Sequence, residues 1–226
     1  MNPWPIVGAI IVAGGLIALA VFYSQPAPPL SNTSNIAPDN NSGANALAAS
    51  VDDDTLLGDP NAPITFIEFG DYQCPFCTRF FNEVESTLRD KYVKTGKMKF
   101  VYRDFPFLGD ESRWAALASE CADEQGKFWE YHDLLFVRHR GENQGTFTKD
   151  NLKRWAGELG LNQGQFDACL DSEKYAEEIK KDLEDARAAG VEGTPTAFIN
   201  GEIVRGALPL SDFERIVEAK LAALNQ

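Results

Sequence analysis

Basic residues are scarce in this chain, and no lysine or arginine precedes Arg79. The 226 residues carry 21 Lys and Arg against 34 Asp and Glu, a formal net charge of −13 at pH 7. Since phosphate groups are bound mainly through lysine and arginine, this balance argues against nucleic acid or an anionic membrane surface as the partner. The four cysteines are too few for a disulfide-scaffold miniprotein, whereas an apolar content of 44% is enough to bury a core.

Charge is also absent from residues 6–23, a continuous apolar stretch. As a helix it would span roughly 27 Å, just enough to cross a hydrocarbon core. Trp4 and Tyr23 stand at its ends, where interfacial aromatic residues occur. We therefore expect residues 1–23 to form a transmembrane anchor. A cleaved signal peptide is the alternative, because Ala18-Leu19-Ala20 resembles a small-residue cleavage site.

Large apolar side chains are almost missing from residues 24–50, which are rich in Pro, Ser, Asn and Ala. A segment of this composition cannot form a core, so we expect a disordered linker with a reach on the order of 30 Å. The globular part should then occupy residues 51–226.

The pattern of apolar residues within 51–226 predicts alternating strands and helices. Strands are expected at 63–70, 97–105, 196–200 and 202–204, and helices at 77–95, throughout about 110–189, and after a capping box formed by Ser211 and Glu214. This order predicts an α/β domain that is interrupted by an all-helical insertion.

The motif Cys74-Pro75-Phe76-Cys77 stands where a strand and a short loop lead into a helix. Unpaired backbone N–H groups at a helix N-terminus stabilise an anion, so a cysteine placed there should ionise below its ordinary pKa. We expect Cys74 to be the exposed attacking thiolate and Cys77 the buried resolving thiol of a redox pair. A structural pair or a zinc site is the alternative, but zinc needs two further ligands that no second CxxC or paired histidine supplies.

Glu68 lies in the middle of the predicted buried strand, six residues before Cys74. Burial of a carboxylate raises its pKa, so Glu68 could accept and return the proton of Cys77. A partly solvated acid at the strand end is the alternative. Thr194-Pro195 enters a later strand, and a proline in this position often marks a cis bond in a tight turn. If that turn faces Cys74, the Thr194 backbone can pair with an extended substrate.

Taken together, these motifs resemble the DsbA family of thiol-disulfide oxidoreductases, over about residues 51–226. The resemblance implies a thioredoxin fold with an inserted helical domain at about 110–189. It also implies that Cys74 is the nucleophile, Cys77 the resolving thiol, Glu68 the buried acid and Pro195 the cis-proline. Phe76, Thr194 and Pro195 would contact the substrate. The chain has Pro-Phe between its cysteines, where strongly oxidising members have Pro-His.

The second cysteine pair, Cys121 and Cys169, falls on apolar faces of the predicted helical insertion. In an exported chain a structural disulfide between them is expected, and two buried reduced thiols are the alternative. His132 and His139 are expected at the surface or in satisfied positions, and neither a metal nor another cofactor is expected. The run 52–54 should be a solvated entry to the domain.

The sequence and the resemblance together predict a single-pass membrane protein whose catalytic domain lies on the periplasmic or cell-surface side. It should act as a monomer on reduced or unfolded exported proteins and be reoxidised by a quinone-linked membrane oxidase of the DsbB or VKOR kind. An isomerase or reductase kept reduced by a partner is one alternative. A non-catalytic module that binds unfolded chains is the other.

Overall fold

The computed structural model describes residue 51 and residues 53–224 of the chain. The predicted anchor at 1–23 lies outside these residues, as do the linker at 24–50 and Asp52. None of the helices in the described part is both long and apolar enough to cross a bilayer.

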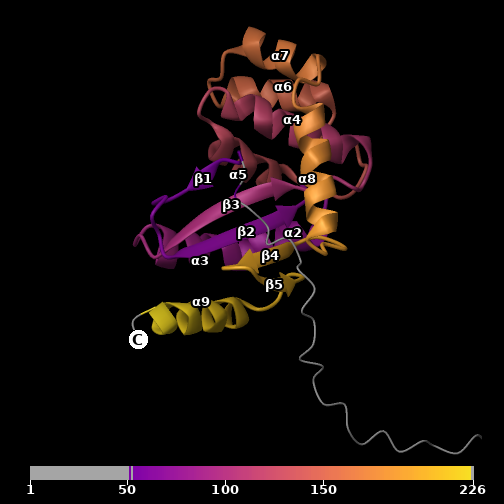
Figure 1. Cartoon of the computed structure of the whole chain (residues 1–226). Coiled ribbons are helices and arrows are strands. Elements are labelled where there is room, and N and C mark those ends of the chain that lie inside the picture. Colours follow the sequence, from indigo (N-terminus) through magenta and orange to yellow (C-terminus); the bar gives the residue numbers. More distant parts are fainter. Residues whose placement is uncertain (1–50, 52, 225–226) are drawn as a thin grey trace, which may run out of the picture. The chain divides into compact units, whose positions relative to one another are not determined.

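A five-stranded sheet in the order β1-β3-β2-β4-β5 forms the centre of the described part (Figure 1). The central pair β2·β3 is parallel, and the other neighbouring pairs are antiparallel. The strands are β1 (Leu56–Leu57), β2 (Ile64–Gly70), β3 (Met98–Asp104), β4 (Thr196–Ile199) and β5 (Glu202–Arg205). Every predicted strand is present with its bounds shifted by at most one residue, and β1 is an addition too short for a sequence pattern to reveal.

Helical turns continue from α2 (Pro75–Phe80) through η1 (Phe81–Glu85) and α3 (Ser86–Leu88) to η2 (Arg89–Val93), where η1 and η2 are π-helical. The predicted start at Cys77 was two residues late, because Pro75 occupies the first helical turn, which needs no backbone donor. The closing helix α9 (Leu210–Leu224) begins before Ser211, so the predicted capping box is wrong.

The insertion consists of α4 (Asp110–Asp123), α5 (Phe128–Arg138), α6 (Lys149–Glu158), α7 (Gln163–Asp171) and α8 (Ala176–Ala188). It is not helical throughout, because residues 139–148 form a loop between α5 and α6. In Figure 1, α4, α6 and α7 lie above the sheet and α9 lies below it.

The two faces of the sheet are covered by different helices. Ile64 and Phe66 pack against the helix that starts at Pro75 and against Phe213 of α9. Ile67 and Phe69 lie in a second cluster with α8. This alternation along β2 agrees with the two-residue period of a strand that is buried on both faces.

A third cluster fills the insertion and includes both Cys74 and Cys77. The cysteine pair therefore lies where the sheet domain meets the helical insertion.

The start of the domain is only in part the solvated entry that was predicted, because Asp53 is exposed but Asp54 is not. Asp54 is largely buried, with its side chain 7% exposed, and its Oδ2 lies 2.8 Å from Nε of Arg103. Arg103 also pairs with Asp182 of α8. Burial and the nearby charge of Asp182 raise the pKa of Asp54 to about 8. Asp54 thus ties the domain entry to β3 and, through Arg103, to α8, which a local charge pattern could not reveal.

Candidate active site

Cys74 is held at the N-terminus of α2 by the loop that follows β2. Its amide donates to the Asp71 carbonyl at 2.9 Å, and its carbonyl accepts from the amide of Thr78 at 3.0 Å. Pro75 is the first residue of the helix, and its fixed φ suits that position. This geometry directs the unpaired amides of the first helical turn toward the Cys74 sulfur.

The two cysteines of the motif are both free thiols. Cys74 is 4% exposed and Cys77 is 0% exposed, so the prediction that Cys74 would be exposed is wrong. Residues from the insertion and from the loop at Thr194 cover the sulfur, and neither could be placed from the local motif. Cys74 nevertheless remains the more accessible thiol of the pair.

The pKa of Cys74 is lowered to about 6. A hydrogen bond from the Cys77 thiol is the largest cause, and burial of Cys74 opposes it. The Thr194 side chain and the amides of Cys77 and Phe76 lower the pKa further. The helix N-terminus thus acts as the sequence indicated, but the neighbouring thiol contributes more.

Cys77 and Glu68 share the buried side of the site. Burial and the hydrogen bond with Cys74 raise the pKa of the Cys77 thiol. Burial and the charge of Glu85 raise the pKa of Glu68, against the opposing charge of Arg89. Neither carboxyl oxygen of Glu68 has a hydrogen-bond partner among the described residues. A neutral carboxyl without a partner can both donate and accept a proton, as a relay requires.

A charged group behind Glu68 was missed by the sequence analysis. Arg89 forms ion pairs with buried Glu85 and, at 2.7 Å, with Asp133 of α5. Its guanidinium also lies 4.6 Å from the ring centre of Trp129. The sequence did contain a signal for this charged group. Cys77, Glu85 and Arg89 are separated by multiples of four residues, a spacing that places them on one face of the helix.

His132 is buried in this group rather than lying at the surface. Its Nδ1 is 3.0 Å from Asp133 and 3.3 Å from Nη2 of Arg89. Burial lowers the pKa of His132 to about 4. Donor atoms of Glu85, His132 and Asp133 lie within 4.8 Å of one another, but the guanidinium of Arg89 already provides the cation that they contact. His139 occupies a satisfied position, with Nε2 2.9 Å from the carbonyl oxygen of Gln73.

The Thr194-Pro195 peptide bond is cis, and this loop lies against the cysteine pair. The Cys74 thiol donates to the Thr194 carbonyl at 3.4 Å. Beside it is a hollow of about 300 Å³, lined by Glu192, Gly193, Thr194, Pro195, Thr196, Arg205 and Gly206. Phe76 is 54% exposed, with the Arg79 guanidinium 5.2 Å from the centre of its ring. An apolar ring and a backbone hollow thus flank the Cys74 sulfur.

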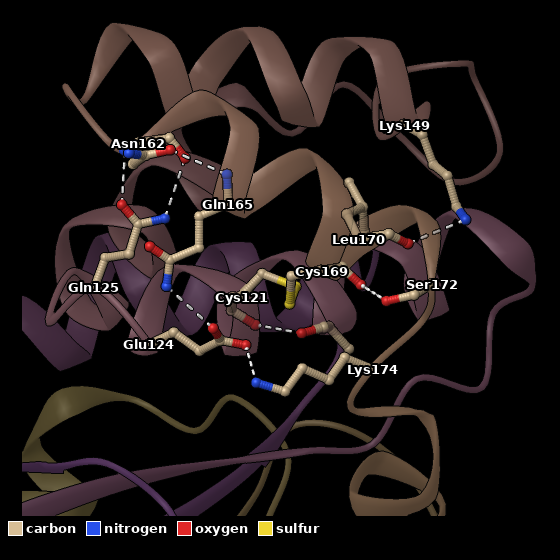
Figure 2. The surroundings of a disulfide bond; sticks show 12 residues. Cys121, Glu124, Gln125, Lys149, Asn162, Gln165, Cys169, Leu170, Ser172 and Lys174 are labelled. Atoms are coloured by element: carbon tan, nitrogen blue, oxygen red, sulfur yellow. Dashed lines mark hydrogen bonds and ion pairs between the residues drawn. A yellow bond between two sulfur atoms is a disulfide. The ribbon is translucent and has the colours of Figure 1, made fainter.

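Cys121 and Cys169 form a disulfide that joins α4 to α7, with their Cα atoms 5.8 Å apart (Figure 2). Glu124 reinforces the same junction, because it accepts hydrogen bonds from Lys174 at 2.7 Å and from Gln165 at 3.3 Å. The disulfide belongs to the insertion and does not include either cysteine of the reactive motif.

A sequence model of the thioredoxin family matches residues 50–219. Disulfide bond formation protein D of Bacillus subtilis is 28% identical over 175 residues, which cover 76% of this chain and 79% of that protein. The Na(+)/H(+) antiporter NhaA 1 of Salinispora arenicola is 31% identical over 173 residues, but these span only 25% of the antiporter and 76% of this chain.

Two solved structures also match this chain over most of its length. The crystal structure of oxidised BdbD from Bacillus subtilis superimposes with a TM-score of 0.73 at 28% identity, covering 76% of this chain and 95% of that one. The crystal structure of alpha-DsbA1 from Wolbachia pipientis superimposes with a TM-score of 0.70 at 27% identity, covering 79% of this chain and 98% of that one. The CxxC pair at a helix start, the cis-proline loop beside it and these matches agree, and the chain therefore belongs to the thioredoxin family as a DsbA-like thiol-disulfide oxidoreductase.

Proposed function

We propose that this protein introduces disulfide bonds into exported proteins, with the Cys74–Cys77 disulfide as the oxidant. The observation that carries the proposal is the difference between the two thiols, since the pKa of Cys74 is about 6 and that of Cys77 is raised. A dithiol whose reduced form contains a stabilised thiolate gives a more oxidising disulfide. Relatives named for disulfide bond formation support the same direction.

The exchange starts with the pair as a disulfide. A substrate thiolate attacks Sγ of Cys74, the Cys74–Cys77 bond breaks, and Cys77 leaves with the electron pair and takes a proton, which we assign to Glu68. A second substrate thiolate then attacks the substrate sulfur of the mixed disulfide, and Cys74 leaves as its thiolate. The substrate has lost two electrons and gained a disulfide, and the enzyme holds a thiolate at Cys74 and a thiol at Cys77.

Substrate contacts are assigned to the face around Cys74. The exposed ring of Phe76 offers apolar contact, and the hollow beside Thr194 and Pro195 can receive an extended backbone. The reduced pair must return its two electrons to another oxidant, and we assign this step to a quinone-linked membrane thiol oxidase of the DsbB or VKOR kind, on the basis of the DsbA likeness.

The equilibrium reduction potential against glutathione tests the oxidase role. We expect a value between about −270 mV, that of thioredoxin, and about −120 mV, that of the strongly oxidising DsbA, because the Cys74 pKa lies between those of the two proteins. A potential at or below about −270 mV would favour the reductase alternative. Unchanged function in a Cys74→Ser, Cys77→Ser double variant would favour the non-catalytic module.

We also propose that residues 1–23 anchor the chain and that residues 24–50 tether the catalytic domain outside the membrane. The charge-free stretch at 6–23 supports an anchor, and the Cys121–Cys169 disulfide suits an oxidising compartment. The intact mass of the protein recovered from membranes, together with labelling of Cys74 in whole cells by a membrane-impermeant thiol reagent, tests both statements. Recovery of a shortened chain from the soluble fraction would indicate a cleaved signal peptide instead.

A further inference from the structure

Gln73, the residue directly before Cys74, is buried, and both polar atoms of its side chain form hydrogen bonds. Its Oε1 accepts from the amide of Asn143 at 2.6 Å, and its Nε2 donates to Oγ of Ser112 at 3.0 Å. Weaker contacts of Nε2 reach Asn143 Oδ1 at 3.4 Å and the Leu108 carbonyl at 3.5 Å. Both ends of the amide are thus held by groups of the insertion and of the loop that leads into it.

Asp71 holds the other end of the same short loop. Its buried carboxylate accepts from the Gln73 amide at 2.8 Å and from Ser112 Oγ at 2.6 Å. It also accepts from the amides of Phe107 and Leu108 at 3.0 and 3.2 Å. Ser112 therefore joins Asp71 to Gln73, and the loop before Cys74 is bound on two sides.

The support for Gln73 is the α5–α6 loop, residues 139–148. Asn143 has a left-handed backbone with φ of 51°, and its Nδ2 donates to the Leu108 carbonyl at 2.9 Å. The Glu111 carboxylate accepts from the amides of Gly145 and Phe147 at 2.8 and 2.7 Å. These contacts fasten the α5–α6 loop to the first turn of α4, so it can act as a fixed support.

We propose that Gln73 is a positioning residue, which holds Cys74 at the helix N-terminus and against Thr194 by fastening its loop to the α5–α6 loop. The backbone at residue 73 sets where the next sulfur lies, and hydrogen bonds to a thiolate weaken steeply as their geometry degrades. The helical insertion thereby controls the reactivity of Cys74. This inference rests on the proposed role of Cys74 as the reacting sulfur.

The test uses the full-length reduced protein and measures the ultraviolet thiolate titration and the rate of alkylation by iodoacetamide. The variants are Gln73→Met, which keeps the length but removes both polar ends, and Ser112→Ala. We expect both to raise the titration midpoint of Cys74, by about one unit for Gln73→Met. Alkylation at a pH below both midpoints should then be about tenfold slower, because the thiolate fraction falls in proportion.

Ser119→Ala is the matched control, since Ser119 is also a buried serine of α4 but its hydroxyl donates to the carbonyls of Ala115 and Ala116 in its own helix. It should leave the Cys74 midpoint unchanged. Asn143→Gly provides a further variant if Gln73→Met does not fold, because glycine keeps the backbone donor at positive φ and removes only the side-chain contacts. It should raise the midpoint by less than Gln73→Met.

The proposal would be overturned if Ser112→Ala kept the wild-type midpoint and alkylation rate and if Gln73→Met, or Asn143→Gly in its place, did so too. Gln73 would then be a structural residue only. A wild-type protein that lacks a low midpoint would instead contradict the proposed function, before any variant is compared.

Discussion

Cys74 and Cys77 are three residues apart, yet their thiols differ because each has a different environment. Cys74 receives hydrogen bonds from Cys77 and the helix amides, whereas Cys77 donates one and is fully enclosed. The same hydrogen bond therefore lowers one pKa and raises the other. A single contact between the sulfurs accounts for much of the division of roles.

Replacing Cys77 tests this contact. Cys77→Ala removes the largest cause of the low Cys74 pKa, so the Cys74 midpoint should rise from about 6 toward its ordinary value. Cys77→Ser keeps a hydroxyl donor at the same position and should raise the midpoint less. Ultraviolet titration of the thiolate measures both. An unchanged midpoint in Cys77→Ala would mean that the helix amides and Thr194 suffice.

Glu68→Gln tests the proton relay. The amide fills the same volume but cannot give a proton to Cys77, so the step in which Cys77 leaves or attacks should slow by about 10²-fold and lose its dependence on pH. Stopped-flow measurement of mixed-disulfide formation and release across a pH series checks this. Glu83→Gln is the control, because Glu83 is an exposed glutamate on the helix that follows Cys74. A pH profile identical to the wild type would make Glu68 purely structural.

At the scale of elements, the helix after Cys74 does more than position the motif. Its face carries Cys77 at the reactive end and Glu85 and Arg89 further along, and these two approach Glu68 and α5. The π-helical turns at Phe81–Glu85 and Arg89–Val93 lie where these residues meet α5. Such turns often occur at functional positions. The helix that follows Cys74 thus positions both the Cys74 sulfur and the charged side chains around Glu68.

The disulfide between α4 and α7 should stabilise the insertion without taking part in exchange. It closes a sequence separation of 48 residues, and in the chain-entropy model this is worth roughly 4 kcal/mol. A Cys121→Ala, Cys169→Ala variant should lose about 2–4 kcal/mol and melt on the order of 5–15 °C lower. Calorimetry measures the loss of stability, and the rate of oxidation of a model dithiol at 25 °C, which should be unchanged, shows whether the disulfide takes part in exchange. A large fall in rate with the fold intact would show that the pair is coupled to Cys74.

At the scale of the whole molecule, buried carboxyls should set how stability depends on pH. The pKa of Glu85 is raised to about 7 and that of Asp54 to about 8, and Glu68 is raised as well. A raised pKa in the folded state gives stability that is present at low pH and lost as pH rises through the folded value. His132 acts in the opposite sense, because its pKa falls from 6.5 to about 4 and its contribution is lost below pH 6.5.

In the oxidised protein Cys74 does not titrate, so its lowered pKa adds no opposing rise in stability. Above pH 6.5 the carboxyl effect then dominates, and the free energy of unfolding of the oxidised protein should fall between pH 6.5 and 8, by on the order of 2 kcal/mol. Urea unfolding at a series of pH values measures this. Glu68→Gln should flatten part of the fall, because it removes one group that is destabilising when charged. Stability that rises across this interval would contradict the assignment of these groups as neutral in the fold.

The sequence by itself determined the features whose causes are local. The apolar run at 64–70, the Cys74–Cys77 motif at a helix start and the proline at 195 each follow from a few neighbouring residues, as do the apolar faces that carry Cys121 and Cys169. Strand burial, helix initiation and turn chemistry act over such short ranges, so pattern and spacing predict them.

Only the tertiary structure decided which distant groups meet these features. Cys74 is covered by Thr194, 120 residues away, and Gln73 is held by Asn143, 70 residues away. Asp54 is buried against Arg103, although its neighbours in sequence indicate a solvated run. Burial and electrostatic environment depend on the packing of whole elements, which local periodicity does not encode. The pKa values and the placement of the reactive sulfur therefore follow from the fold rather than from the motif.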